Sequence, residues 1–258
     1  MKRVTHNKYK TPNKIFNKLD KPHAYTPLSF GLSNDLSGRG IKISILDSGH
    51  PDHPDIKKII ECINITGDNG DKTDKHGHST MISGIIGSKN PQAITGISPE
   101  SSLYFAKVVT KEEECQYNSL VAGVLWSIVK KVDIILMCLG SETDYPVLHD
   151  VIRKAYEQNI CIIAADGISD VDEYPASYPE VLAIGGLPNK CSRSVQLVLP
   201  EYECYTTYLG GSFAKAVGTS LHAAIGAGLA ALLIEKDKKN ITPNSIYSKL
   251  SQLSYRSK

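Results

Sequence analysis

Short apolar runs alternate with helix-like segments along most of this 258-residue chain. Runs rich in Ile, Val and Leu predict buried strands near 41–46, 60–65, 102–108, 132–138, 160–165 and 181–185. The periodicity between them predicts helices near 78–87, 117–130, 147–158, 220–234 and 243–252. Strands that alternate with helices usually pair in parallel and need cover on both faces. The pattern therefore predicts an α/β fold with three layers, α/β/α, around a mainly parallel twisted sheet.

Composition indicates a globular domain and excludes several other classes of protein. Hydrophobic residues make up 41% of the chain, and the formal net charge is only +2. The sequence has no basic patch with interleaved aromatic residues, no glycine-rich phosphate loop and no Cys/His cluster typical of zinc sites. The apolar segment 221–234 is too short to span a membrane and runs into charged residues, so it predicts a buried central helix. We therefore expect neither a nucleic-acid partner nor a membrane partner.

A serine stands at the start of this apolar segment. Ser220 follows Gly218 and Thr219, and a hydroxyl at a helix N-terminus lies beside backbone N–H groups that can stabilise an oxyanion. The same Gly-Thr-Ser turn is an ordinary helix cap. Ser220 alone therefore does not identify a nucleophile.

Two other segments carry residue types that activate a serine. The strand predicted at 41–46 is followed by Asp47, so a carboxylate lies at the carboxyl end of a strand, where sites in α/β proteins collect. The segment 74–87 carries His76 and His78 at the start of an apolar helix rich in small residues. The chain thus offers Asp, His and Ser in this order.

These motifs resemble those of the subtilisin-like serine peptidases, which share the order Asp, His, Ser. The resemblance extends from about Tyr25 to the end of the chain. Its residues are Asp47-Ser48-Gly49, Gly77, His78, Thr80, Gly84 and Gly218-Thr219-Ser220, with further matches at 53–55, 96–99, 103–108, 133–140 and 174–179. The resemblance favours His78 over His76 as the base, because only His78 fits the family's Gly-His-x-Thr spacing. It leaves His76 in a variable loop, where we expect a solvated surface residue.

The resemblance implies a serine endopeptidase that hydrolyses peptide bonds through an acyl-enzyme. Ser220 would attack the peptide carbonyl, His78 would take and return the proton, and Asp47 would orient the imidazole. Processing of a peptide precursor is one role that it suggests. No cofactor is required by this chemistry, and the substrate partner is a peptide or protein.

The oxyanion hole departs from the family pattern. Relatives place an asparagine amide there, whereas direct register puts Ile168 at that position, and an isoleucine side chain cannot donate a hydrogen bond. The remaining candidates are the backbone N–H of Ser220 and a protonated Asp166, although Asp166 is equally typical of a turn before Gly167. A catalytically weak or inactive protein of this fold that binds peptides therefore stays open as an alternative function.

The resemblance also implies where a substrate lies. It assigns Glu114 and Cys115 to an edge strand that pairs with the substrate, and Cys138, Leu139, Gly140 and Gly167 to the opposite wall. The run 112–114 consists of three glutamates. This run predicts a preference for Lys or Arg upstream of the cleaved bond, or alternatively it is a solvated acidic cluster at a helix start.

The resemblance divides the chain into a basic extension, residues 1–24, and a peptidase domain, residues 25–258. The extension is either a disordered tail or a short inhibitory plug in which Ile15 and Phe16 are the apolar contact.

Localisation and metal binding follow from smaller features. Residues 1–21 lack the apolar run of a secretory signal, and the six cysteines form no Cys-x-x-Cys pair, which indicates free thiols in the cytoplasm. Asp55 and Asn90 match positions near a structural calcium loop of relatives, although ordinary surface loops explain both residues as well.

Overall fold

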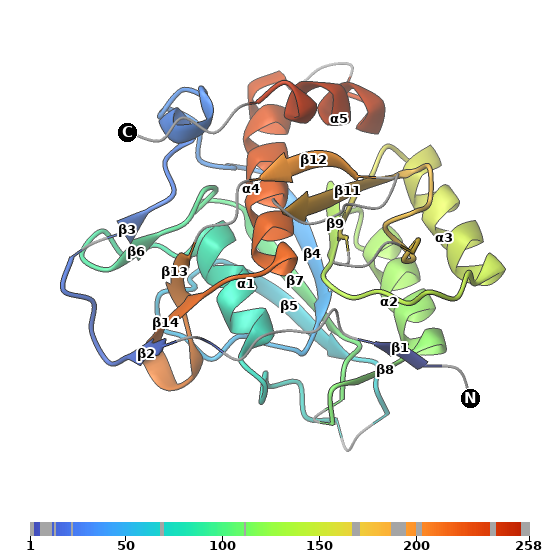
Figure 1. Ribbon diagram of the computed structural model, residues 1–258, viewed down its shortest axis with the longest axis horizontal. Coiled ribbons are helices and arrows are strands. Elements are labelled where there is room, and N and C mark those ends of the chain that lie inside the picture. Colours follow the sequence, from blue (N-terminus) through green and yellow to red (C-terminus); the bar gives the residue numbers. More distant parts are fainter. Residues whose placement is uncertain are drawn as a thin grey trace.

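The computed structural model describes residues 3–5, 12, 14–21, 23–67, 70–110, 112–166, 171–186, 195–199, 203–237 and 241–253. A seven-stranded sheet forms the centre of the molecule, with strand order β12-β11-β10-β9-β4-β7-β5 (Figure 1). Every neighbouring pair in this sheet is parallel. Its strands are β4 (Lys42–Asp47), β5 (Ile59–Asn64), β7 (Ser102–Lys107), β9 (Ile134–Met137), β10 (Cys161–Ala165), β11 (Val181–Gly186) and β12 (Val195–Leu199).

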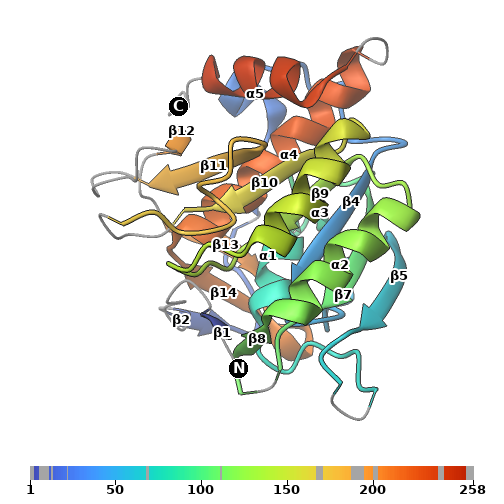
Figure 2. The same cartoon turned by 90° about the vertical axis from the view of Figure 1, so that its right-hand side faces the viewer.

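Helices cover both faces of this sheet (Figure 2). α2 (Tyr117–Val129) and α3 (Pro146–Glu157) lie on one face, and α1 (His78–Gly87) and α4 (Thr219–Asp237) lie on the other, with α5 (Pro243–Ser251) packed on α4. Because successive strand residues point to opposite faces, the strands supply two separate cores. In β9, for example, Leu136 joins the core under α1 and α4, whereas Met137 joins the core under α2 and α3.

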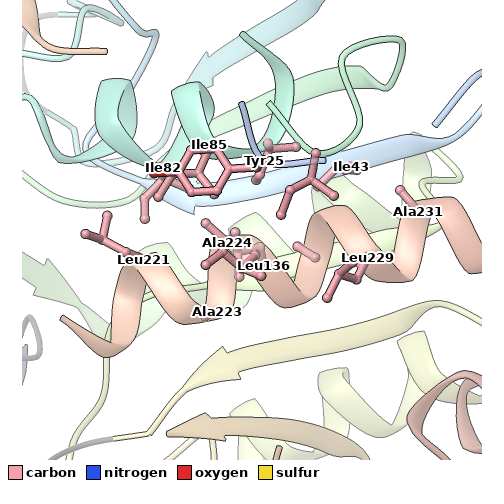
Figure 3. Close-up of a cluster of buried hydrophobic side chains, with 14 of the residues drawn as sticks. Tyr25, Ile43, Ile82, Ile85, Leu136, Leu221, Ala223, Ala224, Leu229 and Ala231 are labelled. Atoms are coloured by element: carbon pink, nitrogen blue, oxygen red, sulfur yellow. The ribbon is translucent and has the colours of Figure 1, made fainter. Parts of the chain in front are cut away.

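The helix α4 runs through the middle of its layer and is buried along almost its whole length, from Thr219 to Leu233. Figure 3 shows Leu221 and Ala224 on the side of α4 that faces Ile82 and Ile85 of α1. The small residues of α4 allow this close approach on several sides. In the part of the chain that the structure describes, no helix is long and apolar enough to cross a membrane.

The predicted three-layer α/β/α fold is confirmed. Each predicted helix and strand has a counterpart whose ends differ by only a few residues. Beyond the prediction, β12 extends the main sheet, and three small sheets lie outside it. They pair β13 (Cys204–Thr207) with β14 (Phe213–Ala216) and β2 (Lys14–Phe16), β1 (Arg3–Thr5) with β8 (Glu114–Gln116), and β3 (His23–Ala24) with β6 (Ile94–Thr95).

Each of these three small sheets attaches the N-terminal extension to the rest of the protein, and β3 does so by pairing in parallel with β6. β2 pairs antiparallel with β14, and β1 pairs antiparallel with β8. The interpretation of Ile15 as an apolar contact is wrong, because this residue is 52% exposed. Phe16, in contrast, packs on Tyr205, with ring centroids 6.1 Å apart. Alternation along β2 explains the difference, since adjacent residues of a strand face opposite sides.

The cysteines of the described ranges are buried and in the thiol form, namely Cys62, Cys115, Cys138, Cys161 and Cys204. Burial raises the pKa of the Cys161 thiol to about 12 and that of Cys204 to about 12, so these two side chains are neutral small hydrophobes. Cys191 lies outside the described residues.

Gly84 on α1 has a steric role that yields a stability prediction. A Cβ at this position would lie 2.4 Å from each of the hydroxyl oxygens of Thr206 and Thr207 and 2.7 Å from the backbone nitrogen of Thr207. Both hydroxyls donate to α1 carbonyls and cannot move away freely. We expect Gly84→Ala to lower the free energy of unfolding by about 1–3 kcal/mol, measured by urea denaturation.

Gly226→Ala is the matched control, because it adds the same methyl group to another buried helical glycine. There the new Cβ meets only the flexible end of the Ile184 side chain. Replacing glycine in a helix interior gains roughly 1 kcal/mol of helix propensity, so this variant should lose less stability than Gly84→Ala. Equal or greater loss in Gly226→Ala would contradict the assignment of the close contact to β13.

Candidate active site

Asp47 occupies the last position of β4, near the middle of the main sheet. Its side chain is buried, with 1% of the residue exposed. The Oδ1 atom accepts hydrogen bonds from the backbone N–H of Ser48 at 2.7 Å and from the Ser48 hydroxyl at 3.0 Å. Such donors stabilise the ionised carboxylate despite its burial.

His78 is the first residue of α1, and its ring contacts this carboxylate. Nδ1 lies 2.8 Å from Oδ2 and 3.0 Å from Oδ1 of Asp47, and His78 has no exposed surface. Burial alone lowers the pKa of His78, but the charge and hydrogen bond of Asp47, followed by the charges of Asp74 and Glu113, raise it above its ordinary value. The carboxylate therefore stabilises the imidazolium form of His78 when it arises, and it holds the ring in one orientation.

Ser220 is the second residue of α4 and is largely buried, with 7% exposed. Gly218, just before the helix, has a φ of 149°, which residues with a side chain rarely adopt. α1 and α4 pack directly against each other, so the helices that begin at His78 and near Ser220 are neighbours. The Cys138 thiol donates to the backbone carbonyl of Ser220 at 3.6 Å, which joins the end of β9 to the start of α4.

His76 is not a solvated surface residue, and that expectation was wrong. Only 11% of its side chain is exposed, and its Nε2 lies 2.8 Å from Oε1 of Glu113. Its ring centroid is 6.3 Å from that of His78. Glu113 holds a φ of 63°, which brings the loop before β8 against His76. No local sequence pattern links the two residues, because the contact arises from tertiary packing.

The residues assigned to substrate binding fall into two groups. Glu114 and Cys115 lie in β8, as the resemblance implied, and Cys138, Leu139 and Gly140 follow β9 directly. The side chains of Cys115, Cys138 and Leu139 are buried, so these positions can offer a substrate only their backbone groups.

The loop expected to complete an oxyanion hole is described only at its start. Gly167 and Ile168 lie outside the described residues. Asp166 follows β10 and is buried, with 1% exposed, and its backbone N–H donates to the carbonyl of Ile184 at 2.9 Å.

Two buried ionisable residues near the site were not identified from the sequence. His222, two residues after Ser220, is 1% exposed, and desolvation lowers its pKa to about 4, against a small opposing effect of the Gly185 backbone. Asp74 precedes α1 and is 2% exposed. The spacing of Asp74 before a helix start is typical of a capping carboxylate, and this pattern could have drawn attention to it.

Asp55 and Asn90 do come together, but not as cation ligands. The Asn90 amide nitrogen donates to Oδ2 of Asp55 at 2.9 Å. The Asn90 oxygen accepts from the backbone N–H of Gln92, which fixes this amide orientation. Calcium needs several oxygen ligands, and this pair does not present them. The described residues also contain no group of three or more His, Cys, Asp or Glu side chains that could hold a metal ion.

Comparison with known proteins agrees with this fold. Residues 38–254 match the subtilase family, Peptidase_S8. The chain is 34% identical to an intracellular serine protease of Paenibacillus polymyxa over 84% of this chain and 74% of that protein. It is 32% identical to the major intracellular serine protease of Bacillus subtilis over the same shares, and 29% identical to subtilisin DY of Bacillus licheniformis over 77% of this chain and 78% of that protein.

The chain therefore belongs to the subtilase family of serine proteases, which act on peptide or protein substrates.

Proposed function

We propose that this protein is an active serine endopeptidase with Asp47, His78 and Ser220 as its catalytic triad. The observation that supports this most is the buried contact of 2.8 Å between His78 and Asp47, at the start of a helix that packs on the helix of Ser220. Ser220 attacks the peptide carbonyl while His78 accepts its proton. His78 then returns a proton to the leaving amine, and Asp47 stabilises the imidazolium between these steps.

The oxyanion hole of this proposal starts from the backbone N–H of Ser220, in the first turn of α4, where such groups lack partners within the helix. The second donor comes from the loop after β10, which contains the candidates Asp166 and Ile168. Asp166 can donate through its side chain only when protonated, and Ile168 only through its backbone. We further propose that the protein works inside the cell, since two of its relatives are named as intracellular proteases.

The triad is tested by labelling with a fluorophosphonate, which reacts with activated serines. Ser220→Ala and His78→Ala should each abolish labelling and peptide cleavage, because they remove the nucleophile and its base. His76→Ala should leave both nearly intact. Loss of labelling in His76→Ala together with retention in His78→Ala would show that His76, and not His78, is the base. An unlabelled wild type would favour a peptide-binding protein without catalysis.

We propose that an extended substrate pairs with β8, beside Glu114 and Cys115, in the manner of an added strand. Support comes from the antiparallel pairing that β8 already makes with β1, in which Val4 lies opposite Cys115. Three glutamates at 112–114 give this edge a negative charge. Selectivity of this kind would suit an enzyme that processes one peptide precursor.

A peptide library tests the charge preference of this edge. Peptides with Lys or Arg upstream of the cleaved bond should be cleaved about 2-fold to 5-fold faster than neutral ones, with a smaller ratio at high salt. Glu114→Gln should reduce the ratio, whereas Glu61→Gln on the distant strand β5 should leave it unchanged. Equal rates of cleavage for basic and neutral peptides would contradict the proposed preference for Lys or Arg.

We also propose that the N-terminal extension acts as a plug, because β1 occupies the edge that this function assigns to substrate. Removal of residues 1–13 keeps β2 and should raise the rate of fluorophosphonate labelling about 10-fold, since a tethered strand competes at millimolar effective concentration. A synthetic peptide of residues 1–13 should then restore part of the inhibition. Identical labelling rates in the full and truncated chains would show that β1 does not block the site.

A further inference from the structure

A second buried carboxylate holds the start of α1. Oδ1 of Asp74 accepts the backbone N–H groups of His76 at 3.0 Å and of Gly77 at 2.8 Å. Oδ2 accepts the backbone N–H and the hydroxyl of Thr80 at 2.8 and 2.7 Å. These contacts lie on both sides of His78 in the chain. Because Gly77 at the N-cap position has no side chain, Asp74 performs the capping from outside the helix.

Ser48 connects this carboxylate to Asp47. The Ser48 hydroxyl lies 2.9 Å from Oδ1 of Asp74 and 3.0 Å from Oδ1 of Asp47, and it accepts the backbone N–H of Ser79 at 3.1 Å. A hydroxyl has one hydrogen, so the two carboxylates share a single donor. The hydroxyl therefore couples the two acids that flank the base.

Several titratable groups surround His78 and the two carboxylates. Among the described residues they include Asp47, Asp74, His76, Glu113, Cys115, Cys138 and Tyr208. Burial raises the pKa of both thiols and of the phenol, so these three are neutral near pH 7. Asp74 is thus the second carboxylate, after Asp47, that stabilises the imidazolium, and it is only 2% exposed, whereas the Glu113 side chain is 59% exposed.

We propose that Asp74 is a positioning residue for the base His78, and that it acts through the first turn of α1 and through Ser48. This inference rests on the proposed triad. In this role Asp74 does not contact the substrate. It fixes the backbone that carries the imidazole and adds a fixed negative charge beside it, so that the base needs little reorganisation when it accepts the proton.

The variant Asp74→Asn keeps the shape of the side chain but removes its negative charge. Its NH₂ group also replaces one acceptor oxygen and therefore faces N–H donors. We expect kcat for a fluorogenic peptide to fall about 10-fold to 100-fold with little change in KM. In the inactive Ser220→Ala background, the same change should lower the pH at which the His78 ring titrates by about 0.5–1 unit by NMR, because a stabilising charge is lost.

Glu235→Gln is the matched control. Glu235 also caps backbone groups, those of Ser37 and Gly38 at 2.7 and 2.6 Å, but it lies in the last turns of α4, at the opposite end from Ser220. This variant should lose stability without altering kcat or the titration of His78. A wild-type kcat, or an unshifted His78 titration, in folded Asp74→Asn would overturn the proposal.

Variants of Ser48 provide a second test of the proposal, which does not require Asp74→Asn to fold. Ser48→Ala leaves the contacts of Asp74 with α1 intact and should lower kcat, and Ser48→Thr, which keeps the hydroxyl, should restore it. An unchanged kcat in Ser48→Ala would show that the Ser48 hydroxyl does not couple the two carboxylates. The NMR readout separates this inference from the proposed function, because Asp74 can shift the His78 titration even if Ser220 proves unreactive.

Discussion

Close packing of α4 against both the sheet and α1 determines where the proposed catalytic residues lie. Few helices are buried on all sides, and this one requires small residues wherever its neighbours approach. A Cβ at Gly228, for example, would lie 2.8 Å from the Cβ and 2.9 Å from the Cγ2 of Ile97. The start of α4 is thereby fixed relative to the start of α1, and the relative placement of Ser220 and His78 depends on this contact.

Burial by itself does not prepare a histidine to act as a base. His78 and His222 are both almost completely removed from solvent, yet their pKa values shift in opposite directions. Desolvation lowers the pKa of His222 to about 4, against the opposing effect of a hydrogen bond with the Gly185 backbone. His78 experiences the same desolvation but contacts Asp47, which lies at the carboxyl end of β4 and is itself held by donors. The sheet therefore supplies the carboxylate, Asp47, whose charge raises the pKa of His78 on the helix.

The order of elements was predictable from the sequence because it rests on local periodicity. The strands β4, β9 and β10 are buried almost throughout, as expected for central parallel strands, and Asp47 directly follows the first of these predicted runs. The hairpin of β13 and β14 was not predicted, because its short strands are specified by distant partners such as β2 and α1. The contact between His76 and Glu113 was missed for the same reason. Asp74 carries a local capping pattern, but its link through Ser48 to Asp47 requires the folded sheet.

The edge strand β8 connects the architecture with the proposed function. An unpaired strand edge presents N–H and C=O groups that require partners, and here the chain's own β1 supplies them over three residue pairs. A pairing this short is weak, and it persists because the extension is tethered nearby through β2. A substrate that extends beyond three residues along the edge gains contacts that β1 lacks. Under the proposed function, β1 does not block the site permanently. The length and charge of a peptide decide whether it displaces β1 and reaches Ser220.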